Sequence, residues 1–298
     1  MYSDGYHIGL LGLEHLHPFD VNKYARIAER LTADGWIEPG QLIDPGEADE
    51  AALLEVHAPW YLDQLKDRDY VSRAIEVPLP WPIPMALLDR GLVGSMRRAT
   101  GGTMRAVQEA LTHGIAINLG GGYHHAQPGL GHGFCIYADV GIALRRALKA
   151  GQVERVLIVD LDAHHGDGNA MVFQDEPAVH ILDLYEANNF PYAKLPVWRK
   201  VEFGPGVGDA EYLEVLEREL PPALEDLRPD LVVYVAGVDV YDQDPLTRFA
   251  LTRSGILARD RFVFEQVRRL DIPLAMVLAG GYAQGVWEIQ HATIQWVL

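Results

Sequence analysis

Cysteine is almost absent from this 298-residue chain, which contains Cys135 and no other. A single cysteine cannot form a disulfide within the chain, and its isolation fits a reducing compartment. A metal site built from several cysteines is excluded too. Any metal must therefore be bound by histidine, aspartate or glutamate.

Long apolar runs and an excess of basic residues are also missing. No run approaches the roughly 18 residues of a membrane-spanning helix, and the first residues, MYSDGYHIGL, lack the basic and apolar regions of a signal peptide. The net charge is -17, without the basic stripe that nucleic-acid binding requires. We therefore expect a cytoplasmic protein with no membrane span and no nucleic-acid partner.

The chain does contain enough apolar residues to fill a large core, because 49% of it is hydrophobic. No linker, repeat or low-complexity tract divides it, so we expect one domain over residues 1–298. The four prolines of VPLPWPIPM (77–85) exclude a helix and predict an extended loop.

Four segments rich in Val, Ile and Leu end in glycine and polar residues. Such runs are typical of strands buried on both faces of a parallel sheet. The segments are GIAINLGGGYHH (114–125), RVLIVDLDAHHGDG (155–168), DLVVYVAGVDVYD (230–242) and PLAMVLAGGYA (273–283).

Helical stretches alternate with these segments. The punctuation by glycine and N-cap residues predicts helices over Asp20–Ala33, Gly102–His113, Ala138–Ala150 and Ser254–Leu270, the last with Ser254 as its N-cap. Alternating strands and helices predict an α/β fold with an open, mainly parallel sheet and helices on both faces.

Ligands of such sheets bind outside the carboxyl ends of the strands, where the polar ends of the four segments would gather. Asp162 and His164 are two apart, so in an extended segment they share one face. Asp239 ends another strand and can supply a third ligand. Two carboxylates and one imidazole with an open position are typical of a catalytic Zn²⁺, although each residue alone would more often serve a turn or cap.

Hydrolysis by water that such a metal activates also needs a group to move a proton. His124 and His125 are the candidates, and Asp160 and Asp167 are acids available to orient them. Tyr282, after a Gly-Gly pair, can donate a hydrogen bond to a developing oxyanion.

The blocks GGGYHH, DLDAHHGDG, AGVDVYDQDPL and AGGY resemble, in the same order, those of the zinc-dependent histone deacetylases, which have the arginase/deacetylase fold. LGLEHLHPFD and DLYEANNFP most resemble the class IV, histone deacetylase eleven-like branch. Class IV sequences tend to have Gln and Asn where this chain has His165 and Asp167, and there it looks more like class I.

This resemblance implies removal of acetyl or longer acyl groups from N-ε-acyl-lysine. The resemblance implies that Asp162, His164 and Asp239 bind Zn²⁺. It implies that His125, oriented by Asp167, is the general base and acid, and that His124, paired with Asp160, is an electrostatic partner. Tyr282 would polarise the carbonyl of the substrate. Gly133, Phe134 and Phe190 would line the acyl-lysine tunnel, with His15 and His17 at its rim. A second cation, K⁺ or Na⁺, would lie near Asp160, Asp162, His164, Asp183 and Leu184.

Three alternatives stay open at this stage. Arginase-like ureohydrolases share the fold, but their second metal needs an aspartate where this chain has Gly166. A deacetylase of acetylated polyamines or other small amides would keep the same catalytic core. A non-catalytic acyl-lysine-binding protein would be expected to have lost a ligand, the histidine pair or the tyrosine.

Overall fold

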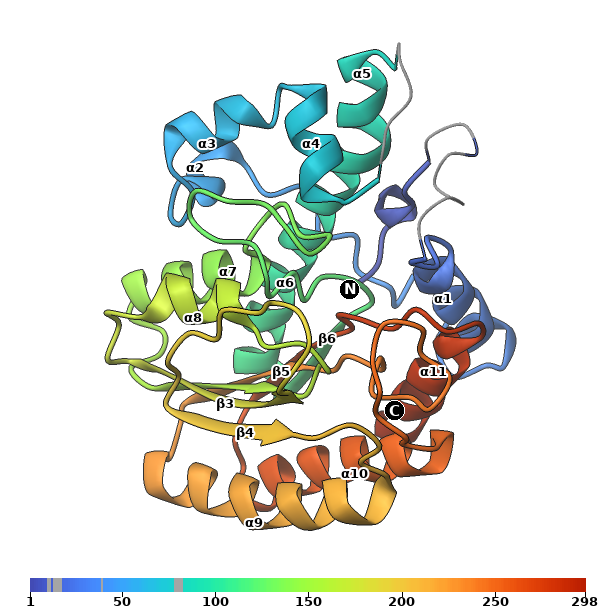
Figure 1. The fold of residues 1–298 in the computed structure, drawn as a ribbon, viewed down its shortest axis with the longest axis vertical. Coiled ribbons are helices and arrows are strands. Elements are labelled where there is room, and N and C mark those ends of the chain that lie inside the picture. The colour runs from blue at the N-terminus through green and yellow to red at the C-terminus, as the bar shows by residue number, and fades with distance from the viewer. Residues whose placement is uncertain (10–11, 13–17, 39, 78–82) are drawn as a thin grey trace.

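The computed structural model describes residues 1–9, 12, 18–38, 40–77 and 83–298 (Figure 1). At its centre lies a six-stranded sheet with the order β1-β6-β5-β2-β3-β4, in which every neighbouring pair is parallel. The strands are β1 (Ile115–Asn118), β2 (Val156–Asp160), β3 (Val179–Glu186), β4 (Arg199–Phe203), β5 (Leu231–Val235) and β6 (Leu274–Val277).

Helices cover both faces of this sheet. The α-helices of the described residues are α1 (Lys23–Ala33), α2 (Glu50–Leu53), α3 (Pro59–Gln64), α4 (Arg68–Ala74), α5 (Met85–Leu88), α6 (Gly94–His113), α7 (Asp139–Lys149), α8 (Asp167–Phe173), α9 (Asp209–Leu227), α10 (Arg253–Arg269) and α11 (Val286–Val297), with the 3₁₀ helix η1 (Asp4–Tyr6) and the π-helix η3 (Asp89–Val93).

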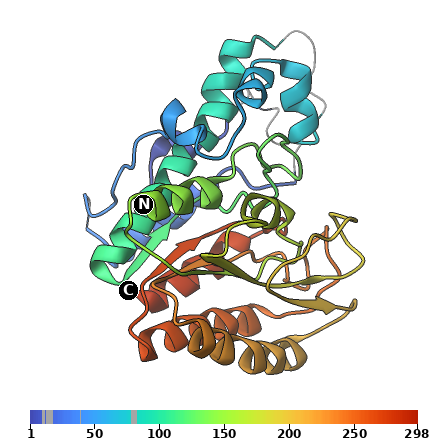
Figure 2. The same cartoon turned by 90° about the vertical axis from the view of Figure 1, so that its left-hand side faces the viewer.

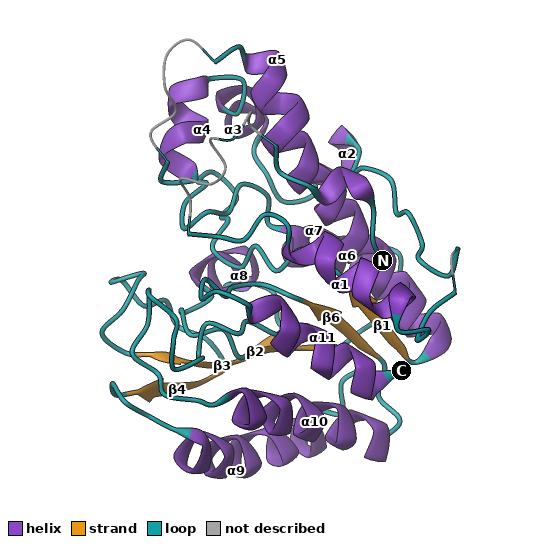
Figure 3. Ribbon diagram, turned by 90° about the vertical axis from the view of Figure 1, so that its right-hand side faces the viewer, coloured by secondary structure: helices purple, strands orange, loops and turns teal. Residues whose placement is uncertain are grey.

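The alternation of side chains along β2 explains the layers. Leu157 and Val159 join the apolar cluster of α9, α10 and α11, whereas Val156 and Ile158 join that of α6, α7 and α8. Figure 3 shows α9 and α10 on one side of the strands and α6 and α7 on the other. The predicted parallel sheet with helices on both faces is confirmed.

A third apolar cluster lies away from the sheet. It joins the short helices α2 to α5 to the outer sides of α6 and α7. These short helices form a separate group at the top of Figure 2. Within the described ranges, no helix is long and apolar enough to cross a membrane.

The four predicted strands are all present, but the sequence analysis did not predict β3 and β4. β3 carries Asp183 and Glu186 inside an apolar run, and both side chains are buried. β4, RKVEF, is an edge strand whose exposed face holds charged residues. Both strands were missed because acidic or other charged residues interrupt their apolar runs.

Two helices begin more than one residue away from their predicted starts. α1 begins at Lys23 rather than at Asp20, and α6 begins at Gly94 rather than Gly102. Gly101 lies inside α6, and an added Cβ there would lie 2.4 Å from the carbonyl oxygen of Gly46. This glycine therefore allows the helix to pack closely against Gly46 and does not end the helix. α9 was not predicted.

The N-terminus of α10 differs as well. Its N-cap is Thr252, whose hydroxyl accepts a hydrogen bond from the amide of Gly255, so the expected cap at Ser254 was wrong. The predicted loop at 77–85 falls partly outside the described residues. Its predicted end at Met85 is one residue too late, because Met85 already begins α5.

Candidate metal and catalytic site

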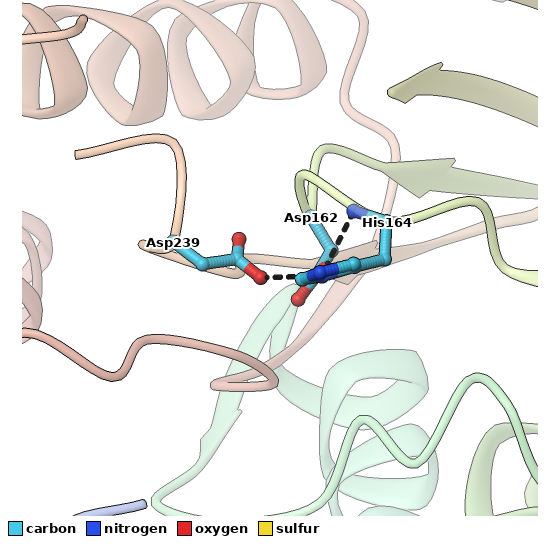
Figure 4. A group of neighbouring side chains, drawn as sticks. All are labelled: Asp162, His164 and Asp239. Carbon is cyan, nitrogen blue, oxygen red and sulfur yellow. Dashed lines mark hydrogen bonds and ion pairs between the residues drawn. The ribbon is translucent and has the colours of Figure 1, made fainter. Parts of the chain in front are cut away.

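Three of the predicted ligands meet at the carboxyl edge of the sheet. His164 Nδ1 lies 2.9 Å from Asp239 Oδ2 and 3.1 Å from Asp162 Oδ1, and one ligand atom from each residue lies within 4.8 Å of the others (Figure 4). All three side chains are buried. Asp162 and His164 converge through a turn after β2, not through an extended strand as expected.

Backbone amides hold the two carboxylates in place. The amide of Gly280 donates to Asp162 Oδ2 at 2.9 Å, and that of Ala163 donates to Asp239 Oδ1 at 2.9 Å. A Cβ on Gly280 would lie 2.5 Å from both Asp162 Oδ2 and Asp239 Oδ2. Glycine at this position therefore leaves room for both carboxylates to face the same point.

The electrostatics of this group fit a cation. Burial, together with the charge of Asp162, raises the pKa of Asp239 to about 7, because two carboxylates so close repel each other in a dry environment. A metal ion among them would remove that repulsion. Two carboxylate oxygens and one imidazole nitrogen form a ligand set that Zn²⁺ accepts.

The adjacent histidines follow the glycine run after β1, in which Gly121 and Gly122 both have positive φ. His124 Nδ1 lies 2.9 Å from Asp160 Oδ2, and His125 Nδ1 lies 2.7 Å from Asp167 Oδ1. The structure therefore contains both histidine–aspartate pairs that the resemblance implies.

The two histidines differ in charge. Burial lowers the pKa of His124, but Asp160 and Asp162 outweigh burial and raise it to about 10. Burial and the neighbouring charge of His124 lower the pKa of His125 to about 3, although Asp167 opposes them. At neutral pH, His124 carries a proton on both ring nitrogens, and His125 is neutral.

Tyr282 is placed by its backbone and by aromatic neighbours. Its amide donates to Asp244 Oδ2 at 2.8 Å, and its ring meets those of Phe134 at 5.7 Å and His164 at 6.5 Å between centroids. Burial, followed by the charges of Asp162 and Asp239, raises the pKa of Tyr282 well above its usual value. The phenol thus keeps its proton and can donate it in a hydrogen bond.

The predicted tunnel residues lie around His125. The ring of Phe190 is 5.0 Å from that of His125, and a Cβ on Gly133 would come within 2.6 Å of His125. Gly133 and Phe134 line a pocket together with His124, His125, Asp162 and Tyr282. The apolar part of its lining, called the apolar chamber, includes Ile8, Val21, Tyr24, Ile75, Val77, Leu92 and Met96.

The residues expected around a second cation lie behind the metal ligands. Asp183 is fully buried, and its Oδ2 accepts hydrogen bonds from His165 Nδ1 at 2.7 Å and from the amide of Gly166 at 3.1 Å. No hydrogen-bond donor from the described residues reaches Asp183 Oδ1. A buried carboxylate oxygen without a donor fits a nearby cation. Asp160 and Leu184 are also fully buried.

His165, which had no role in the sequence analysis, is a structural residue. Its Nδ1 faces Asp183, and its Nε2 accepts a hydrogen bond from the amide of Leu195 at 3.0 Å. Both ring nitrogens are thus engaged, and the histidine attaches the segment that follows β3, with Phe190, to the sheet. His15 and His17 lie outside the described residues.

Sequence reasoning missed two buried cations beside the site. Lys23 donates from Nζ to the carbonyl of Ala279 at 2.8 Å, and Arg259 donates from Nη1 to the carbonyls of Leu161 and Gly237 at 3.1 and 2.8 Å. Both side chains are fully buried among carboxylates that they help to neutralise. A signal existed for Lys23, because it lies on the apolar face of α1.

Sequence reasoning also missed two partners of Asp167. Gln127 Nε2 donates to Asp167 Oδ2 at 2.8 Å, and His132 Nε2 lies 3.0 Å from the same oxygen. The sequence feature that comes nearest to indicating His132 is its place between two glycines, two residues before Phe134.

Comparison with known proteins supports the resemblance to histone deacetylases over nearly the whole chain. Residues 17–296 match the model of the histone deacetylase domain. The chain is 38% identical over 285 residues to histone deacetylase 2 of Arabidopsis thaliana, covering 95% of this chain and 74% of the relative. It is 30% identical to a probable deacetylase of Archaeoglobus fulgidus, covering 90% and 77%.

A solved structure extends this likeness to the fold. The crystal structure of the HDA15 HD domain superposes with a TM-score of 0.77 at 23% identity, covering 94% of this chain and 83% of that one. The predicted arginase/deacetylase fold and the predicted hydrolase are confirmed by these matches. The chain belongs to the histone deacetylase family of hydrolases.

Proposed function

We propose that this chain is a zinc-dependent hydrolase that removes acyl groups from N-ε-acyl-lysine side chains. The observation that carries the proposal is the convergence of Asp162, His164 and Asp239 beside two histidine–aspartate pairs. A Zn²⁺ held by these three residues would polarise the substrate carbonyl and lower the pKa of a coordinated water to about 7. The names of the relatives support a deacetylase reaction.

His125 is the group that moves the proton. Because its Nδ1 faces the carboxylate of Asp167, its proton lies on Nδ1 and its Nε2 has a free lone pair. Nε2 takes the proton of the attacking water and then passes it to the departing lysine amine. His124, charged and paired with Asp160, contributes a fixed positive charge next to this step.

Tyr282 stabilises the oxygen that becomes negative during attack. Its phenol keeps its proton at neutral pH and can donate a hydrogen bond to that oxygen. We assign Phe134 and Phe190 to the walls beside the lysine side chain and Gly133 to the passage beside His125. The ring contacts of Phe190 with His125 and of Phe134 with Tyr282 support this assignment, as does the lack of room for a Cβ on Gly133.

The apolar chamber supports an acyl chain longer than acetyl. The pocket that contains His125 and Tyr282 also has Val21, Leu92 and Met96 in its lining, and an acyl chain longer than acetyl would have more atoms to contact them. Each CH₂ of an acyl chain that leaves water is worth about 0.8 kcal/mol. A medium-length chain therefore gains more from this pocket than acetyl does.

A panel of substrates tests the function and the chain length together. Metal-loaded protein is assayed with lysine peptides bearing acetyl, octanoyl and myristoyl groups and with acetylated polyamines. We expect hydrolysis of the lysine peptides, with kcat/KM about tenfold or more higher for octanoyl than for acetyl. Met96→Phe, which fills the chamber, should reduce that ratio.

Two results would contradict the proposal. Turnover of acetylated polyamines alone would assign the chain to small amides. Binding of acyl-lysine peptides without turnover would make it a non-catalytic acyl-lysine-binding protein.

Two finer assignments belong to the same proposal. We place the chain in the class IV branch on the likeness of LGLEHLHPFD and DLYEANNFP, the first of which lies mostly outside the described residues. We also place a K⁺ or Na⁺ ion near Asp183, whose unpaired Oδ1 supports a cation there.

A further inference from the structure

Asp167 has two oxygens, and the proposed reaction uses only one of them. Oδ1 faces His125 at 2.7 Å, whereas Oδ2 receives Gln127 Nε2 at 2.8 Å and lies 3.0 Å from His132 Nε2. The side chains of Asp167 and His125 are 5% and 6% exposed, but that of His132 is 21% exposed. His132 therefore lies between the buried pair and the solvent.

The backbone fixes His132 in this place. A tight turn connects it to Cys135, whose amide donates to the carbonyl of His132 at 2.9 Å, and Gly133 within this turn has a φ of +54°. The ring of Phe190 covers His132 at 5.5 Å between centroids. His132 is thus packed against Asp167 and has little freedom to leave it.

The charge of Asp167 determines which nitrogens carry protons. Burial raises the pKa of this carboxyl, but its contacts with His125 and His132 outweigh burial and bring the pKa well below the usual value. Asp167 is therefore an acceptor only, and each nitrogen that faces it must donate. His132 donates from Nε2 while His125 donates from Nδ1.

We propose that His132 is a positioning residue, which holds Asp167 from its second oxygen so that Asp167 orients His125 for proton transfer. This role rests on the proposed function of the site. Asp167 tethered at both oxygens cannot rotate away from His125. The tautomer of His125, with Nε2 free, is then fixed.

A pair of amide substitutions tests the position of the donor. In His132→Gln, the amide nitrogen lies about as far along the side chain as Nε2, so it can still donate to Asp167. In His132→Asn, the amide ends near the place of Nδ1 and falls short. We expect His132→Asn and His132→Ala to lower kcat about tenfold with little change in KM, and His132→Gln to recover most of that loss.

Gln127 limits this effect, because it still donates to Asp167 Oδ2 in each variant. His113→Ala serves as the control, since His113 is 66% exposed at the end of α6, beside the amino end of β1 and thus at the sheet edge opposite the site. It should leave kcat unchanged. Equal kcat in wild type, His132→Asn and His132→Ala would overturn the proposal, as would an equal loss in His132→Gln and His132→Asn.

A second measurement does not depend on turnover. In ¹⁵N-histidine NMR of the metal-loaded protein, His125 should be a single Nδ1-protonated tautomer in wild type and His132→Gln, and a mixture in His132→Asn. A single tautomer in all three proteins would overturn the role of His132. The expected NMR pattern without hydrolysis of any acyl-lysine peptide would contradict only the proposed function.

Discussion

At the scale of single residues, the partners of each imidazole distinguish its role. His165 uses both ring nitrogens in buried hydrogen bonds, so it is a structural residue. Among the described residues, His125 is hydrogen-bonded through Nδ1, and the proposed function assigns its Nε2 to proton transfer. A sequence cannot make this distinction by itself, because the partner of His165 at Leu195 is 30 residues away along the chain.

Tyr282→Phe removes one oxygen and tests the role of the phenol. We expect kcat to fall about 10²-fold, because the developing oxyanion loses one donor in a buried site. The metal content should stay at the wild-type value, since the phenol is not among the ligands. Steady-state kinetics and elemental analysis of the same preparation check both expectations, and an unchanged kcat would exclude this role.

The candidate ligands were predictable because each one follows an apolar run that stops abruptly. Asp162 and His164 follow one such run, Asp239 follows a second, and Tyr282 follows a third. His132, Lys23 and other supporting residues carry no such mark. Lys23 lies on the apolar face of its helix, but its contact with Ala279 and that of His132 with Asp167 cannot be deduced from the sequence, because the partners lie far apart along the chain.

At the scale of helices and strands, glycine and N-cap residues predicted that a helix exists better than they predicted where the helix begins. The predicted helix began at Gly102, but α6 begins at Gly94 and continues through Gly101 and Gly102, where neighbouring segments pack too closely for a side chain. β4 escaped prediction because its exposed charged side chains interrupt the apolar pattern of an edge strand. Tertiary packing overrode the local signal in both cases.

Thr252→Ala tests the revised start of α10. The hydroxyl of Thr252 accepts from the amide of Gly255 and contacts Asp209 Oδ2 at 2.6 Å, so it caps α10 and joins it to the start of α9. Its loss should lower the free energy of unfolding by about 1 kcal/mol in urea titrations.

Ser254→Ala is the matched control for this cap. Ser254 is exposed, and its hydroxyl contacts only the hydroxyl of Thr252 among the described hydrogen bonds, so we expect a change of less than about 0.5 kcal/mol. A larger loss in Ser254→Ala than in Thr252→Ala would restore the originally predicted cap.

At the scale of the whole molecule, strand order brings the chemistry together. β1, β6, β5 and β2 are consecutive neighbours in the sheet and all run parallel, so their carboxyl ends form one edge. The histidine pair, Tyr282, Asp239 and the Asp162 turn follow these four strands. The prediction that the polar ends of the parallel strands lie together at one edge of the sheet is therefore confirmed, although the sequence did not reveal the order of the strands.

This edge concentrates negative charge that needs compensation. Buried carboxylates from β2, β3 and β5 face only a few buried cations, among them Lys23 and Arg259. A metal ion at Asp162, His164 and Asp239 would supply further positive charge. The proposed function requires one such ion per chain at these residues.

Titration of metal-free protein with Zn²⁺, followed by hydrolysis of an acyl-lysine peptide, tests this claim most directly. We predict that wild-type activity rises linearly and stops at one equivalent of zinc, and that Asp162→Ala and Asp239→Ala neither retain zinc nor gain activity. Full activity without metal, or stoichiometric zinc retained by both variants, would contradict the account.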